Sequence, residues 1–188
     1  FAVIYYFKED LAEAIKHYDL SSADSFLNKL IIASLPIFLV GFIFRDFVSE
    51  NLRTLNTIAI STILFGFILW GANYFSKAHS EKKLVSVRDA FLIGLAQCFA
   101  LIPGASRSAV TIICALFLSY SRSVSSKFAF MLAIPTLGVI FISELASISF
   151  SSFEEGWLNI FLITFFSFIT SYACISLFLK FIERVGFM

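Results

Sequence analysis

Four long apolar segments constrain this 188-residue chain more than any other feature of its sequence. Each has about 20 residues, the length that an α-helix needs to cross the hydrocarbon core of a bilayer. They occupy residues 30–48, 54–75, 128–146 and 157–179. Only 14% of the residues are charged, against about a quarter in an average soluble domain. The sequence therefore predicts an all-α integral membrane protein, built as a multi-span helical bundle.

The rest of the composition argues against several other classes of protein. Net charge is +1 and no basic patch is interleaved with aromatic residues, so nucleic-acid binding is not expected. The two histidines, His17 and His79, are too few for a histidine-based metal cluster. The three cysteines, Cys98, Cys114 and Cys174, lie in apolar segments without CxxC spacing, which favours packing over a disulfide.

A fifth apolar segment, residues 90–119, is interrupted at its centre by the sequence Pro-Gly-Ala-Ser-Arg-Ser. Pro103 and Gly104 are expected to end an incoming helix, because proline has no amide hydrogen and disfavours a helical residue before it. A second helix is expected to begin near Ser106. Broken helices are tolerated within a membrane where protein or water surrounds the loose backbone, so this segment is the candidate for a site.

Arg107 is the residue of this segment that most strongly indicates a function. An ionised side chain at membrane depth costs several kcal/mol, so it is retained where a partner receives it. A guanidinium matches phosphate oxygens with two parallel N–H donors, and the free amides at a helix N-terminus also favour an anion. The sequence therefore predicts an anion site. The predicted catalytic residues are Arg107, Ser106 and Ser108, and the predicted substrate-binding residues are Gly104, Arg107, Thr111 and Gln97.

Two structural interpretations compete with this site. Ser106 could simply cap the second helix while Arg107 extends towards a lipid headgroup. Gln97, a polar side chain in the first half of the segment, could steady the hairpin instead of touching a ligand. Because Arg107 lies far from either apolar end of its segment, we favour the anion site.

The distribution of charge predicts how the chain is threaded. Basic side chains are frequent in residues 8–29 and 76–89 and absent from the loop that contains Glu154 and Glu155. By the positive-inside rule, the acidic loop falls outside the cell only if residues 90–119 enter and leave the membrane on the same side. We therefore predict one polytopic membrane domain over the whole chain, with a re-entrant helix–loop–helix at 90–119.

Three further residues carry structural predictions. Gly66 and Gly71 are expected to mark close contacts between helices, because glycine lets two backbones approach. Arg122, which follows the broken segment, is expected to lie at a polar surface.

The broken segment resembles the second signature of the undecaprenyl-diphosphatase family, also called the bacitracin-resistance BacA family. The matching stretches are Ile93–Gln97, Ala100–Ser108 with Thr111, Ser121–Arg122 and Phe128–Pro135. The resemblance extends along nearly the whole chain and is specific between Asp89 and Pro135. Ala109 departs from the family pattern, which commonly has glycine at this position.

The resemblance implies a multi-pass hydrolase of the bacterial inner membrane. Such an enzyme hydrolyses undecaprenyl diphosphate, a polyprenyl diphosphate lipid, to the monophosphate carrier used in peptidoglycan synthesis, and confers bacitracin resistance. The implied fold is an inverted repeat with two re-entrant hairpins, of which this chain would hold one half and part of the other. Arg107 would bind the pyrophosphate group, and Ser106, Ser108 and Thr111 would line the same pocket.

The resemblance also implies a first signature, a pair of glutamates followed by PxSSTxH, which we expect to precede Phe1. That signature is thought to supply the metal ligands and the nucleophile or acid–base group. We therefore expect residues 1–188 to be truncated at both ends and inactive alone. A divalent cation, Mg²⁺ or Ca²⁺, is expected to be bound mainly by residues preceding Phe1, with no metal ligand within residues 1–188. The sequence is compatible with a homodimer and does not decide the oligomeric state.

The residues by themselves leave a second function open, a membrane transporter or lipid flippase with an anion site at the midplane. Transporters also use broken helices and inverted repeats. No acidic residue lies between Asp89 and Glu144 to act as an acid–base group. Other enzyme classes are disfavoured, because the motif lacks the GxSxG spacing and the chain lacks GxxxxGK[ST]. The family resemblance favours the phosphatase.

Overall fold

The computed structural model describes residues 1–16, 18, 24–76, 84–147 and 157–184, and every regular element within them is a helix. In chain order these are α1 (Ala2–Tyr6), α2 (Lys8–Lys16), α3 (Phe26–Phe47), the π-helix η1 (Val48–Leu52), α4 (Leu55–Ser76), α5 (Val87–Gln97), the 3₁₀-helix η2 (Cys98–Leu101), α6 (Arg107–Phe117), α7 (Arg122–Ser147) and α8 (Trp157–Arg184). The prediction of an all-α membrane bundle is confirmed.

Among the described residues, four helices are long and apolar enough to cross a membrane. They are α3 continued by η1, α4, α7 and α8. Their outer faces carry exposed apolar side chains such as Phe42, Trp70 and Phe161. Side chains of this kind are stable on a surface that hydrocarbon covers, because the bilayer interior is as apolar as they are. The third span begins at Arg122, six residues earlier than predicted, and continues directly from the broken segment.

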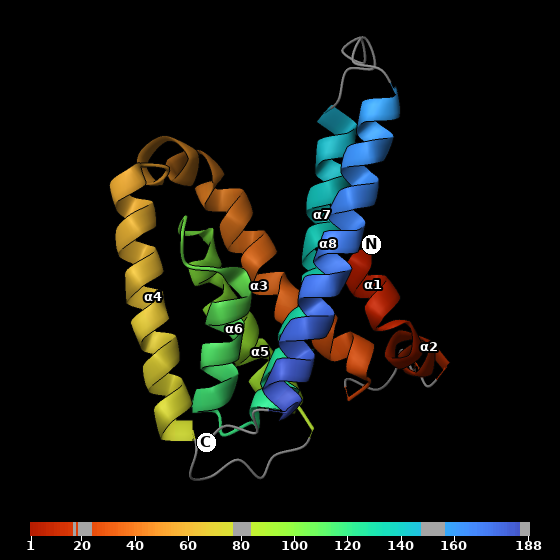
Figure 1. The fold of residues 1–188 in the computed structure, drawn as a ribbon. Coiled ribbons are helices and arrows are strands. Elements are labelled where there is room, and N and C mark those ends of the chain that lie inside the picture. The colour runs from red at the N-terminus through yellow and green to blue at the C-terminus, as the bar shows by residue number, and fades with distance from the viewer. Residues whose placement is uncertain (17, 19–23, 77–83, 148–156, 185–188) are drawn as a thin grey trace.

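Helices α5 and α6 form a short antiparallel hairpin at the centre of the bundle (Figure 1). Each has 11 residues, which corresponds to roughly 16 Å, about half the thickness of a bilayer core. Helix α5 packs against α3, whereas α6 packs against α4 and α7. The feet of the hairpin lie at one end of the bundle and its tip points towards the end where η1 lies. The chain thus returns to the end from which it came.

A glycine determines how closely the hairpin approaches α3. A Cβ atom added to Gly94 would lie 2.1 Å from the carbonyl oxygen of Ala33, which no side chain could tolerate. By contrast, Cβ atoms added to Gly66 or Gly71 would meet nothing within 4 Å. The prediction that these two glycines mark helix contacts is therefore wrong. Helix α4 faces the hairpin with the other side of its surface, which includes Ala72.

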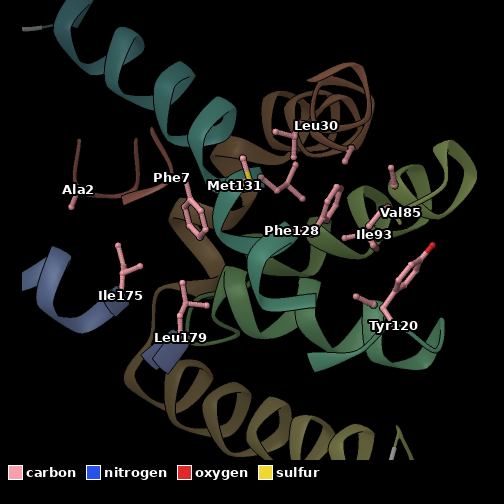
Figure 2. Packing of buried hydrophobic residues seen from close by; sticks show 14 residues of the cluster. Ala2, Phe7, Leu30, Val85, Ile93, Tyr120, Phe128, Met131, Ile175 and Leu179 are labelled. Carbon is pink, nitrogen blue, oxygen red and sulfur yellow. The ribbon is translucent and has the colours of Figure 1, made fainter. Parts of the chain in front are cut away.

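The main apolar core lies around the lower half of the hairpin (Figure 2). Helices α1, α3, α5, α7 and α8 all contribute to it, and Ile93, Met131 and Leu132 are completely buried. Burial of such side chains contributes about 1.5–3 kcal/mol each in a soluble core, but less where the alternative is lipid. Close packing around these residues holds the hairpin in a single position.

A polar network joins the two feet of the hairpin. The Tyr120 hydroxyl, which lies just beyond α6, donates to the Asp89 carboxylate of α5 at 2.5 Å. The Ser86 amide donates to the Tyr120 oxygen at 3.3 Å, and the Asp89 amide donates to Ser86 Oγ at 3.1 Å. Both side chains of the central pair are buried. These bonds fasten the start of α5 to the end of α6.

Arg122 is buried, so its prediction as a surface residue is wrong. Its Nη2 donates to the Asn73 carbonyl oxygen at 2.9 Å. Asn73 lies in the last turn of α4, where carbonyl groups have no partner within the helix and a cation is favoured by the helix dipole. The arginine therefore connects the beginning of α7 to the end of α4.

Candidate functional site at the hairpin tip

The hairpin tip is a tightly shaped turn between η2 and α6. Ile102 is extended, and the Ala105 amide donates back to the Ile102 carbonyl at 3.1 Å. Gly104 has a φ of +94° and Ser106 a φ of +54°. Glycine adopts positive φ without cost, whereas serine does so uncommonly, and strained residues of this kind cluster at functional sites. The backbone conformation is consistent with the predicted site.

Helix α4 holds the tip through two hydroxyl groups that the sequence interpretation missed. Ser61 Oγ donates to the Pro103 carbonyl, and Thr62 Oγ1 donates to the Gly104 carbonyl at 3.2 Å. A Cβ atom on Gly104 would lie 2.5 Å from both the Ile58 carbonyl oxygen and Ser61 Oγ. Gly104, a predicted substrate contact, therefore has a clear structural role against α4. The available signal was a pair of adjacent hydroxyl residues inside an apolar span.

Ser106 lies at the N-terminus of α6, where the second helix was expected to begin. Its side chain is exposed, and its Oγ accepts a long hydrogen bond of 3.5 Å from the Ala109 amide. This is the cap of a helix start, which uses the oxygen as an acceptor and leaves the hydroxyl proton available to another partner. The other amides of the first turn have no partner within the helix.

Arg107 is the first residue of α6 and is half-buried against α7. Its Nη1 donates to Thr136 Oγ1 at 3.2 Å. The Thr136 hydroxyl lies within 3.2 Å of the Leu132 and Ala133 carbonyls of its own helix, so its proton can be donated there while its oxygen accepts from Arg107. Thr136 thus directs the guanidinium. The sequence interpretation missed this contact, which joins residues 29 positions apart.

The charge of Arg107 has no acidic partner in the part of the chain that the structure describes. The ion pairs found there join Lys29 to Asp24 and Lys127 to Asp10, all outside the hairpin. A threonine hydroxyl is neutral and occupies one of the five N–H donors of a guanidinium. Because a charge removed from water requires compensation, the tip is prepared for an anion.

The other predicted site residues lie at different depths. Ser108 is half-buried in the first turn of α6. Thr111 lies one turn deeper, and its buried hydroxyl donates to the carbonyl of Arg107 or Ser108, at 3.1 and 3.0 Å. Gln97 is completely buried at the end of α5, and neither polar atom of its side chain has a partner among the described residues. The structure brings Ser106, Arg107 and Ser108 together, while Thr111 and Gln97 remain predicted substrate contacts.

The side chains described at the tip do not fit a metal ion. They are hydroxyls and one guanidinium, and no group of three His, Cys, Asp or Glu residues that could hold a metal occurs among the described residues. A permanent positive charge at Arg107 would also repel a cation. The divalent cation therefore stays a prediction.

A cavity of about 500 Å³ lies elsewhere, between α2, α3 and α7. Its rim contains Asp10, Lys29 and Lys127, and both lysines already pair with carboxylates. None of the predicted site residues lines it. The cavity is therefore separate from the tip.

The fold and the tip define a class, a multi-pass membrane protein with a candidate site for an anionic group on a short central hairpin. The family model described as "Bacitracin resistance protein BacA" matches residues 1–188. An undecaprenyl-diphosphatase of Alteromonas mediterranea is 34% identical over 196 aligned residues, which cover all of this chain and 73% of that protein. The chain belongs to the BacA family, and the predicted resemblance is confirmed.

Proposed function

We propose that this chain carries the diphosphate-binding half of an undecaprenyl-diphosphate phosphatase. The enzyme hydrolyses the lipid diphosphate to the monophosphate in the bacterial inner membrane. The single observation that supports the proposal is Arg107, half-buried at the tip without an acidic partner among the described residues, in a chain of the BacA family. A diphosphate group supplies the negative charge that this arrangement lacks.

The roles of the tip residues follow from their donors. Arg107 remains protonated and would hold two oxygens of the diphosphate with parallel N–H groups. Ser106 and Ser108 would donate hydroxyl protons, and the first amides of α6 would add their partial positive charge. Water would attack the terminal phosphorus as its bond to the bridging oxygen breaks, so that inorganic phosphate leaves and negative charge grows on the bridging oxygen, which stays with the lipid monophosphate. Donors already in place stabilise that charge without reorganising.

Groups deeper in the hairpin and outside this chain would complete the site. Gln97 would contact the substrate with its buried amide, and Thr111 would contact it once its hydroxyl turns from its own helix. A divalent cation, bound mainly by residues preceding Phe1, would supply further charge stabilisation when present. The polyprenyl tail would stay in the hydrocarbon that surrounds the exposed apolar faces of the spans.

The proposed threading places the tip nearer the periplasmic face. This threading follows from the positive-inside rule, which puts the basic loops in the cytoplasm and the acidic loop outside. Several of the residues that decide it, including Lys82, Lys83, Glu154 and Glu155, lie outside the described residues. The described helices are arranged compatibly, since η1 lies at the end towards which the tip points (Figure 1).

The test is release of inorganic phosphate from undecaprenyl diphosphate by the purified intact protein. We expect one phosphate per lipid, with undecaprenyl monophosphate as the product. The monophosphate itself serves as the control substrate and should release nothing. Movement of the diphosphate lipid across a vesicle membrane without phosphate release would overturn the proposal in favour of a flippase.

A further inference from the structure

Within the part of the chain that the structure describes, the side chains that donate to the backbone of the hairpin tip come from α4. Ser61 and Thr62 donate to the carbonyls of Pro103 and Gly104, two consecutive residues that lie 42 positions further along the chain. The contact is so close that only glycine fits at position 104. On the other side of the tip, α7 contacts the side chain of Arg107 through Thr136.

We infer that Ser61 and Thr62 are positioning residues for diphosphate binding, acting through the tip backbone. The inference rests on the proposed function, because it assigns these hydroxyls to the same site. Only Ala105 and Ser106 separate the held carbonyls from Arg107. Holding Pro103 and Gly104 therefore sets where α6 begins and where its first amides and its arginine point.

The strained turn explains why such anchors are needed. Both Gly104 and Ser106 have positive φ, and within the turn the backbone bond described is the one from the Ala105 amide to the Ile102 carbonyl. A peptide flip at Gly104 would turn its carbonyl away from Thr62 and displace Arg107. Misplacing a reacting or binding group by 1 Å can reduce turnover by about a hundredfold.

The two hydroxyls are not equivalent. Ser61 Oγ also lies 2.6 Å from the Thr57 carbonyl and 3.2 Å from the Ile58 carbonyl, so its single proton has three acceptors within reach. Serines inside helices commonly donate to their own backbone in this way. The one hydrogen bond described for the Thr62 hydroxyl goes to Gly104. Thr62 is therefore the firmer anchor, and Ser61 can alternate between holding the tip and bonding within α4.

The test compares Thr62→Val, Ser61→Ala and the double variant with the wild-type intact protein. Thr62→Val keeps the shape of the side chain and removes the donor, and Thr62→Ser restores the donor. Thr57→Val is the matched control, because the Thr57 hydroxyl pairs with Thr54 at 2.8 Å at the beginning of the same helix. The readouts are kcat/KM for undecaprenyl diphosphate, the Kd of inorganic pyrophosphate and the melting temperature.

We expect kcat/KM to fall about tenfold for Thr62→Val, less for Ser61→Ala, and by up to about a hundredfold for the double variant. The Kd of pyrophosphate should rise in the same order. Thr62→Ser and Thr57→Val should both stay near the wild type. Melting temperatures should change by no more than about 5 °C, since each substitution removes one hydrogen bond.

Two results would overturn the inference. One is wild-type kcat/KM and pyrophosphate affinity in the double variant. The other is a fall in kcat/KM that parallels a fall in melting temperature, while the Kd of pyrophosphate for the folded protein is unchanged. If the wild type binds pyrophosphate without hydrolysing the lipid, the proposed function fails and the affinity series alone decides the inference. If the wild type does neither, both fail.

Discussion

The tip and the base of the hairpin both contain buried or half-buried polar groups, but they treat them differently. At the base, the Tyr120 hydroxyl donates to the Asp89 carboxylate, the Ser86 amide donates to the Tyr120 oxygen, and Ser86 Oγ accepts from the Asp89 amide. At the tip, Arg107 has one partner among the described residues, which is neutral, and Ser106 is exposed. A network that is satisfied internally holds the fold together. A group that keeps unused donors is prepared for a ligand.

The two arginines of this region show the same contrast through the helix dipole. Arg122 donates to a carbonyl in the last turn of α4, where a positive charge is favoured. Arg107 lies at the first position of α6, where the helix end is itself positive and a cation is disfavoured. An arginine at such a position becomes favourable when an anion binds to both the guanidinium and the helix amides. The location of each arginine thus indicates its role.

The largest expected effect is the loss of catalysis in Arg107→Ala. Removing the guanidinium should lower kcat/KM for undecaprenyl diphosphate by about a hundredfold to a thousandfold. Loss of a single charge-stabilising donor has an effect of this size in other enzymes. The melting temperature should be unchanged or slightly higher, because an unfavourable charge leaves the helix start. Arg45→Ala, at the exposed end of α3, is the matched control and should remain active. An active Arg107→Ala variant would contradict the distinction between a ligand-binding tip and a structural base.

The second effect concerns stability and is expected for Gly94→Ala. Its Cβ would collide with the Ala33 backbone, so α3 and α5 would have to separate at a cost of about 1–3 kcal/mol. A lower melting temperature with unchanged kcat/KM of the folded protein is the expected result. Gly66→Ala is the control, since its Cβ meets nothing and alanine favours the helix. Equal melting temperatures for the two variants would contradict the close contact.

The third effect, again a loss of stability, is expected for Tyr120→Phe. The substitution removes the hydroxyl that donates to the buried Asp89 carboxylate, at a cost of about 1–3 kcal/mol. Catalysis should be retained, because the feet of the hairpin lie away from the tip. Tyr74→Phe, on an exposed residue, controls for loss of a tyrosine hydroxyl. If Tyr120→Phe lowered kcat/KM as strongly as Arg107→Ala, the base could not be regarded as purely structural.

The smallest effect is a dependence of stability on alkaline pH. Burial, and then the hydrogen bond to Asp89, raise the pKa of Tyr120 above its ordinary value of 10.0. The folded protein therefore keeps this proton more tightly than the unfolded chain does. Its contribution to stability is fully present below pH 10 and is lost as the pH rises towards the raised pKa. The melting temperature of the wild type should fall more steeply above pH 10 than that of Tyr120→Phe, and parallel curves would contradict the prediction.

The sequence by itself determined the spans and the broken segment, and it identified Arg107 as the candidate site residue. Hydropathy over about 20 residues, a proline followed by glycine and a charge among apolar residues are local features, and each has one dominant physical consequence in a membrane. The tertiary structure alone decided which groups hold the tip. Ser61, Thr62 and Thr136 are distant in the chain, and nothing local distinguishes them from other hydroxyls that bond to their own helix. The burial of Arg122 and the contact at Gly94 likewise depend on which face of one helix meets another, a matter of packing that residue order does not encode locally.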